Sequence, residues 1–204
     1  KLQTQIDYME AHAECTFCVT GAALVDPDKR DIGSVCPYET DCDIPMDELI
    51  RGGGGFVATA SIVAPTHLAK KRAAFCDMAD VDDAVLQLWF GANGTTHYFA
   101  QKMCAYRFNV PGSWTKTFFA ARHEARIRHH EGMARALRSF DEETSGRWHD
   151  AVEYCVTYQQ EYEILRLKND VRSLNRPPYR ALYKELPLKR RIRMHLAYLG
   201  IIRQ

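Results

Sequence analysis

The sequence predicts a mainly α-helical protein with an irregular, cysteine-containing N-terminal segment, a central helical bundle and an extended basic C-terminal tail. Turn-forming residues accumulate before the glycine run at 52–55, and apolar residues recur at helical spacing after Pro65. A Pro-Pro pair at 177–178 then separates the body from a basic stretch. We therefore expect three parts: an acidic Cys-rich segment (1–51), a helical body (56–173) and a basic extension (174–204).

The composition is that of a globular protein. A chain of 204 residues can bury one substantial core, and 46% hydrophobic with 26% charged residues is ordinary for such a protein. No uninterrupted apolar run approaches the roughly 20 residues that span a bilayer. We therefore expect no transmembrane segment.

The N-terminal third is predicted to contain little regular structure. A short helix is expected within 1–14, followed by loops and short strands across 15–45, where Gly and Asp-Pro-Asp sequences are frequent. The four glycines at 52–55 predict a hinge, and the apolar residues 56–63 a strand or buried segment.

Helices are predicted for most of the remainder. Thr66 is a candidate cap for a first helix reaching Met78, and Asp80 or Asp82 opens a second that ends near Gly91. Apolar helical spacing resumes at 98–106. Ser113 is a candidate N-cap for the next helix.

Two longer helices should form an antiparallel hairpin. Apolar residues repeat at intervals of three and four across 114–140 and again across 147–173. Because the link at 141–146 is short and polar, the two helices should lie side by side. A last amphipathic helix is expected over 188–199.

Charge is strongly segregated along the chain although the net charge is only +1. Residues 1–50 carry eleven acidic and three basic side chains, whereas residues 172–204 carry nine Lys or Arg and one Glu. The two ends could neutralise each other in the fold, or the basic end could contact an external polyanion or acidic partner. Arg is twice as frequent as Lys, which favours multidentate contacts to carboxylate or phosphate.

Four cysteines form the only cluster with the composition of a chemical site: Cys15, Cys18, Cys36 and Cys42. Two thiolates separated by two residues can be presented to zinc by one tight turn, and the second pair meets that spacing loosely. A structural Zn²⁺ would stabilise a segment too polar to fold alone. Free thiols, disulfides and an iron–sulfur cluster are the alternatives. A thiol–disulfide redox pair at Cys15 and Cys18 is disfavoured because we expect no βαβ unit around it.

Other motifs do not reach the pattern of a functional site. Cys76, Cys104 and Cys155 lie in apolar periodic segments and are expected to be buried small hydrophobes. His123 and His129 are six residues apart, on opposite faces of a helix, and Ile occupies the position that a helical zinc motif would need. No catalytic carboxylate pair, triad or nucleotide fingerprint is present, so we expect no catalysis and no small-molecule substrate.

The basic tail is the second candidate site. Its cations are interleaved with Tyr and His side chains, a pattern that fits rRNA, an anionic lipid surface or an acidic protein groove. The partner-binding residues predicted here are Arg176, Arg180, Lys184, Lys189, Arg190, Arg191 and Arg193.

These features predict a non-catalytic accessory subunit of a large mitochondrial assembly. The Arg bias, the start at Lys1 instead of Met and the lack of a secretory signal favour mitochondria. The near-neutral total charge favours a respiratory-chain or ATP-synthase complex, with other protein subunits as partners. The alternative is an organellar ribosomal protein with zinc at the N-terminal cysteines and rRNA on the tail. A third class is a small thiol enzyme using Cys15 and Cys18.

Overall fold

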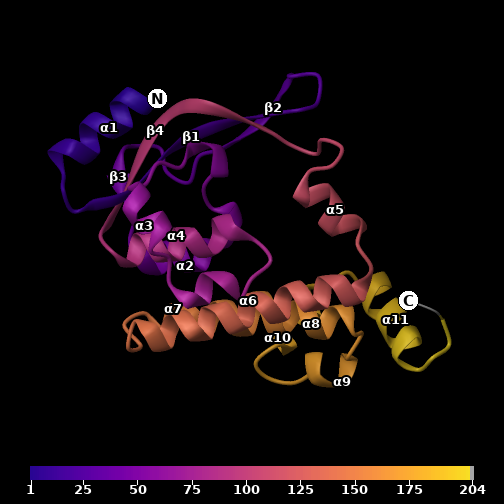
Figure 1. Cartoon of the computed structure of the whole chain (residues 1–204). Helices are drawn as coiled ribbons and strands as arrows, with labels where there is room; N and C mark the ends of the chain where they lie inside the picture. The colour runs from indigo at the N-terminus through magenta and orange to yellow at the C-terminus, as the bar shows by residue number, and fades with distance from the viewer. Residues whose placement is uncertain (203–204) are drawn as a thin grey trace.

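The centre of the protein is a four-stranded mixed sheet. In the computed structural model, which describes residues 1–202, the strands lie in the order β2-β1-β4-β3 (Figure 1). The expectation of a mainly α-helical fold with an irregular N-terminal segment is therefore wrong, and the fold is mixed α and β. The strands are β1 (Cys15–Val25), β2 (Asp31–Val35), β3 (Cys42–Asp43) and β4 (Thr95–Arg107).

The sheet joins segments that are about eighty residues apart in sequence. β1 pairs in parallel with β4, with Cys18 opposite His97 and Val19 opposite Tyr98. β2 pairs antiparallel with β1 across the Asp26-Pro27-Asp28 turn, and β3 pairs antiparallel with β4. The segment 98–106, expected to be helical, is thus a strand. β1 of the predicted N-terminal segment and β4 of the predicted body form one sheet, so both contribute to one core.

Short helices fill the connection from β3 to β4 and cover the inner face of the sheet. Residues 56–63, expected to be a strand or a buried segment, contain a 3-10 turn and a single bridge from Val63 to Cys18, and Val57 and Ala58 are buried. The four glycines end one helix and form the next 3-10 turn. The elements are α2 (Met46–Gly52), η1 (Gly53–Gly55), η2 (Thr59–Ser61), α3 (Thr66–Lys70), η3 (Ala74–Asp77) and α4 (Asp82–Ala92). On the opposite face lies α1 (Leu2–Ala11).

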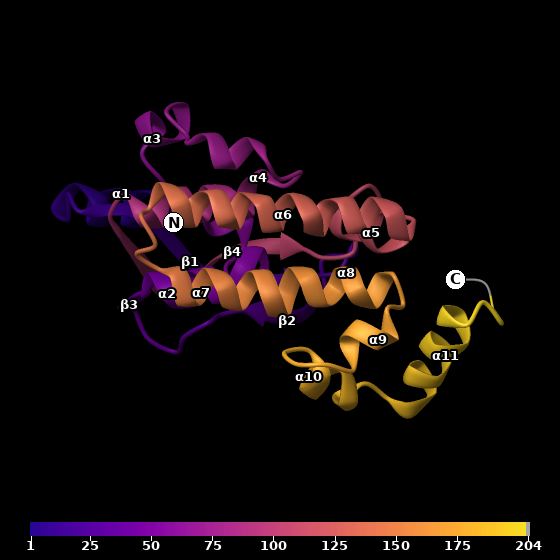
Figure 2. The ribbon, with the colours of Figure 1, turned by 90° about the horizontal axis from the view of Figure 1, so that it is seen from below.

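The helical hairpin lies within the predicted ranges, but the first predicted helix is broken at 121–122, so its long arm begins at His123. A short α5 (Trp114–Ala120) begins at Ser113, whose side chain accepts a hydrogen bond from the Lys116 amide as expected of an N-cap. The two arms of the hairpin run side by side in opposite directions (Figure 2). They are α6 (His123–Glu143) and, after the turn, α7 (His149–Cys155), the π-helical η4 (Val156–Glu161) and α8 (Tyr162–Leu167).

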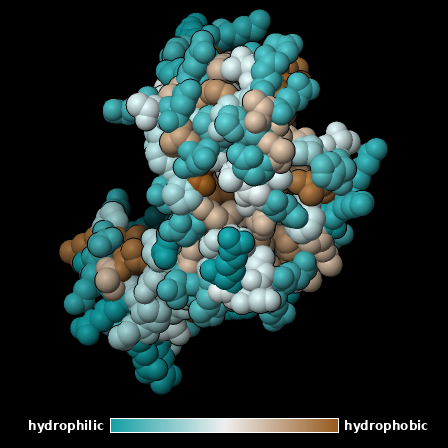
Figure 3. Space-filling model, turned by 90° about the vertical axis from the view of Figure 1, so that its left-hand side faces the viewer, coloured by the Kyte–Doolittle hydropathy of each residue, from teal (hydrophilic) through white to brown (hydrophobic). Residues whose placement is uncertain are grey.

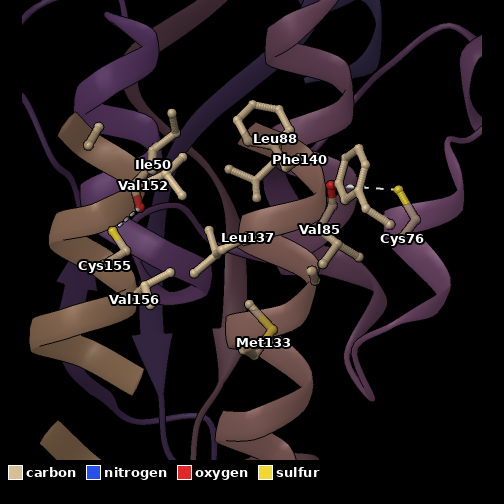
Figure 4. Packing of buried hydrophobic residues seen from close by; sticks show 13 residues of the cluster. Ile50, Cys76, Val85, Leu88, Met133, Leu137, Phe140, Val152, Cys155 and Val156 are labelled. Carbon is tan, nitrogen blue, oxygen red and sulfur yellow. Dashed lines mark hydrogen bonds between the residues drawn. The ribbon is translucent and has the colours of Figure 1, made fainter. Parts of the chain in front are cut away.

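The largest buried cluster joins the hairpin to α2 and α4 (Figure 4). Phe140 is fully buried and contacts the ring of Phe75 edge-on at 5.4 Å between centroids. The Cys155 thiol donates a hydrogen bond to the Ile50 carbonyl at 3.2 Å. Cys155 and Cys76 are buried as predicted, whereas Cys104 is partly exposed.

A separate lobe follows the hairpin. It consists of α9 (Val171–Leu174), α10 (Arg180–Glu185) and α11 (Leu188–Tyr198). We call residues 171–202 the C-terminal arm; residues 203–204 lie outside the described chain. Within residues 1–202 no helix is both long enough and apolar enough to cross a membrane.

Candidate functional sites: a thiol–imidazole cluster and a basic arm

A bulge at the start of β1 brings the first two cysteines together. Residues three apart on a regular strand face opposite sides of the sheet. The register of β1 against β4 shifts between Cys15 and Phe17, and the extra residue lets Cys15 and Cys18 face the same side. Their thiols are hydrogen-bonded to each other, and neither residue is more than 3% exposed.

Aromatic and acidic side chains surround this thiol pair on the face covered by α1. The ring of Tyr8 stacks on His97 with 3.8 Å between centroids and on His12 with 4.1 Å. Nδ1 of His97 lies 2.7 Å from a carboxylate oxygen of Asp43. Because Cys18 and His97 are register partners, the sheet itself fixes the imidazole beside the thiols.

The two thiols differ in acidity. The pKa of Cys15 is lowered to about 7, chiefly by the hydrogen bond with Cys18 and further by backbone groups of Phe17 and His97. The pKa of Cys18 is raised by the same hydrogen bond and by burial. Cys15 is therefore the sulfur that ionises near neutral pH.

Cys36 and Cys42 lie on the other side of the sheet. Cys42 is the register partner of Tyr98, which follows His97 on β4. Because successive strand residues face opposite sides of the sheet, Cys42 faces away from the side that carries His97. Cys36 is exposed and approaches the same Tyr98 side chain. Within residues 1–202 no group of three or more His, Cys, Asp or Glu side chains is gathered as a metal site. The zinc site stays a prediction, and the placement of the four cysteines does not support it.

The geometry allows the thiol cluster limited chemistry. A βαβ arrangement does surround Cys15 and Cys18, contrary to expectation, since β1 and β4 are parallel and joined through helices. The pair lies within a buried strand, however, and not at an exposed helix start where redox cysteines meet their substrates. The arrangement fits a packing role for the two thiols, or their oxidation to each other, better than turnover of an external substrate.

The predicted partner-binding residues form one lobe. The C-terminal arm packs Val171, Leu174, Tyr183 and Met194 against Tyr162 of α8. It is fastened to the hairpin by a hydrogen bond of 2.7 Å from the Tyr179 hydroxyl to Glu161. The arm stands apart from the body (Figure 2), and Figure 3 shows a lower lobe where hydrophilic and hydrophobic groups both reach the surface.

The seven predicted cations of the arm form no salt bridge in the described chain. Six of the seven predicted residues are exposed, and Arg191 is partly buried. No salt bridge within residues 1–202 involves any of them. The acidic N-terminal region lies at the other end of the molecule (Figure 1), so the two charged ends do not neutralise each other by contact.

The fold adds cations that the sequence did not indicate. A hollow of about 240 Å³ lies between α11 and the hairpin and is lined by Arg190 and Arg193 together with Arg126 and Arg166. Arg166 is paired with Glu163, whereas the guanidinium of Arg126 lies over the Phe118 ring at 5.2 Å. Arg126 belongs to α6, more than forty residues before the arm in sequence, so only the tertiary structure shows that it joins the arm. The hollow suits phosphate or carboxylate groups.

No known protein family, curated protein or solved structure matches this chain.

Proposed function

We propose that this protein is a non-catalytic accessory subunit of a large mitochondrial assembly, a respiratory-chain or ATP-synthase complex, and that its C-terminal arm docks on an acidic partner surface. One observation carries the proposal: the arm holds its predicted cations on a lobe with a small core shared with α8, and these cations form no salt bridge within residues 1–202. Unpaired cations on a projecting lobe are free to meet carboxylates on another chain.

Apolar side chains on the arm support a protein partner. Leu188, Ile192 and Leu199 on or just after α11 are more than half exposed. They lie among the Arg residues of the same helix, and protein interfaces combine apolar anchors with a charged rim in this way. A mixed surface of this kind fits a neighbouring subunit better than a uniformly charged polymer.

Purification from the source organism tests the proposal. The native protein should co-purify with a defined set of chains identified by mass spectrometry, and the double variant Arg190→Glu/Arg193→Glu should lose them. Lys70→Glu/Lys71→Glu is the matched control, because these two adjacent exposed cations belong to the body and should leave the partners unchanged. Isolation as a single chain without partners would overturn the proposal.

A second candidate is an organellar ribosomal protein, with the arm on rRNA. The Arg-lined hollow favours it, because guanidinium groups bind phosphate in the same geometry as carboxylate. This alternative predicts co-purification with rRNA and an RNA affinity that falls steeply with salt. Weak, salt-insensitive RNA binding together with recovery of protein partners would leave only the first candidate.

A further inference from the structure

A large cavity lies between the sheet and the helical hairpin. It has a volume of about 740 Å³, within the range of small-molecule sites. Its walls come from the ends of β1, β2 and β4, from η1 and α4, and from α6 and η4, with α5 along one side (Figure 1). None of the thiol cluster or the basic arm takes part in it, so the cavity is independent of both sites described above.

One residue that lines this cavity carries a buried polar atom without a partner. Gln87 of α4 is 2% exposed, lines the cavity, and its side-chain nitrogen makes no hydrogen bond within residues 1–202. Buried polar groups are nearly always hydrogen-bonded, because leaving one unpaired destabilises the fold. An amide nitrogen can only donate, so the missing partner is an acceptor atom.

Two histidines of α6 lie in the same cavity with fixed orientations. Nδ1 of His130 lies 2.9 Å from Oε1 of Gln160 and donates to it, which leaves Nε2 as an acceptor. Burial lowers the pKa of His130, so the ring is neutral at physiological pH. Nδ1 of the neighbouring His129 pairs with Asp80.

The charge of the walls excludes anionic ligands. Among the described lining residues none is Lys or Arg, whereas three are aspartates. Asp82 pairs with Arg72 at 3.2 Å and Asp83 accepts from Thr59, so these carboxylates are held by protein groups. Leu88, Met133, Leu137 and the ring of Trp114 give the rest of the surface an apolar character. Because no lining residue is Lys or Arg, a carboxylate or phosphate would be buried without a cation in the wall to balance its charge.

We propose that this cavity binds an uncharged, mostly apolar small molecule whose carbonyl oxygen accepts a hydrogen bond from the Gln87 amide. The apolar walls bury the body of the molecule, and Gln87 fixes its orientation. His130 provides an acceptor for a hydroxyl or N–H group on the same ligand. This site departs from the expectation of a protein without a small-molecule ligand, and it does not depend on the proposed docking of the arm.

Fluorescence titration of the purified full chain tests the proposal with three naphthyl probes. Prodan is an uncharged ketone, N-phenylnaphthylamine is uncharged and lacks a carbonyl, and anilinonaphthalene sulfonate is an anion. We expect saturable binding of both uncharged probes, with energy transfer from Trp114 at the cavity wall that Trp114→Phe reduces. The anion should bind at least about tenfold more weakly than the ketone. Equal binding of the anion, or energy transfer unchanged in Trp114→Phe, would overturn the assignment.

The variant Gln87→Met isolates the hydrogen bond. It keeps the side-chain length and removes the amide, so the ketone should bind about three- to tenfold more weakly while the naphthylamine binds as before. Gln101→Met, at an exposed position of β4, is the matched control and should change neither affinity. Equal loss for both uncharged probes, or no loss for the ketone, would overturn the role of Gln87.

Thermal unfolding of the free protein supplies a test that needs no probe. If the Gln87 amide is unpaired without ligand, Gln87→Met should raise Tm by about 2–4 °C. An unchanged or lower Tm would show that the amide is already satisfied, by buried water for example, and would contradict the proposal. Should the variant not fold, the ranking of ketone over sulfonate on the native chain still decides the charge preference.

Discussion

The body and the C-terminal arm are stabilised by different means. In the body, residues from α2, α4, α6 and α7 share one continuous cluster that includes the fully buried Phe140. The arm contributes four residues to a small buried cluster that also includes Tyr162 of α8, and most of its predicted cations are exposed. The body therefore contributes most of the stability, whereas the arm presents charge. A weakly anchored, charged lobe is what a docking element requires, since it can order on its partner.

Removing a large buried side chain should have the most different effects on stability in the body and in the arm. Phe140→Ala removes a ring that contacts Phe75 and Trp148, and should cost about 3–5 kcal/mol of global stability. Met194→Ala in the arm should unfold residues 171–202 locally and leave the main transition unchanged. Urea unfolding followed by circular dichroism, with hydrogen exchange for the arm, measures both. Equal shifts of the main transition would show that arm and body form one cooperative unit.

The thiol cluster gives the body a specific pH dependence. The pKa of Cys15 falls from the ordinary thiol value of 9.0 to about 7 on folding, so the folded state binds fewer protons between these values. The stabilisation from Cys15 is therefore complete above pH 9 and lost as pH falls through 7. The raised pKa of Cys18 acts in the opposite direction above pH 9.

Comparison with Cys15→Ser isolates this effect. The native protein should gain on the order of 1 kcal/mol over the variant between pH 7 and pH 9, or about 2–4 °C in Tm. Differential scanning calorimetry at several pH values measures the difference. Parallel curves for the two proteins would contradict the acidity assigned to Cys15.

Charge changes on the arm should affect binding and not folding. Arg190→Glu/Arg193→Glu alters exposed residues without acidic partners, so we expect a change within about 0.5 kcal/mol in the free energy of unfolding. Chemical denaturation of this variant beside Lys70→Glu/Lys71→Glu checks it. A large loss of stability in the arm variant alone would indicate that these cations are structural.

The smallest expected effect is at the start of α5. Ser113→Ala removes the hydrogen bond to the Lys116 amide and should cost about 0.5–1 kcal/mol, limited to α5 by its short length. Hydrogen exchange of residues 114–120 measures it, with Ser113→Thr as the conservative control. A loss that spreads to α6 would show that α5 is coupled to the hairpin.

Local patterns predict the hairpin and the last helix, because helical periodicity is contained in the segment itself. They do not predict the sheet, because its pairing is not local. Gly21 favours a loop at the position of β1, yet that glycine allows close approach of β4: a Cβ there would lie 2.8 Å from the carbonyl oxygen of Ala100. The spacing of aromatic residues in β4 also fits a helix. The sequence alone does not show that a strand about eighty residues earlier pairs with this segment.

The candidate sites follow the same rule. The seven predicted cations can be found from the sequence because they lie within eighteen residues of one another, whereas Arg126 of α6 joins them only in three dimensions. Spacing alone predicts one metal site for Cys15, Cys18, Cys36 and Cys42. The strand pairings instead direct Cys18 and Cys42 to opposite faces of the sheet.

Hydrogen exchange on the protein in its native assembly, compared with the isolated chain, tests the docking role of the arm most directly. We predict that amides of residues 171–202 become strongly protected in the assembly, while those of β1 and β4 change little. Unchanged exchange in the arm, with new protection confined to the body, would contradict it.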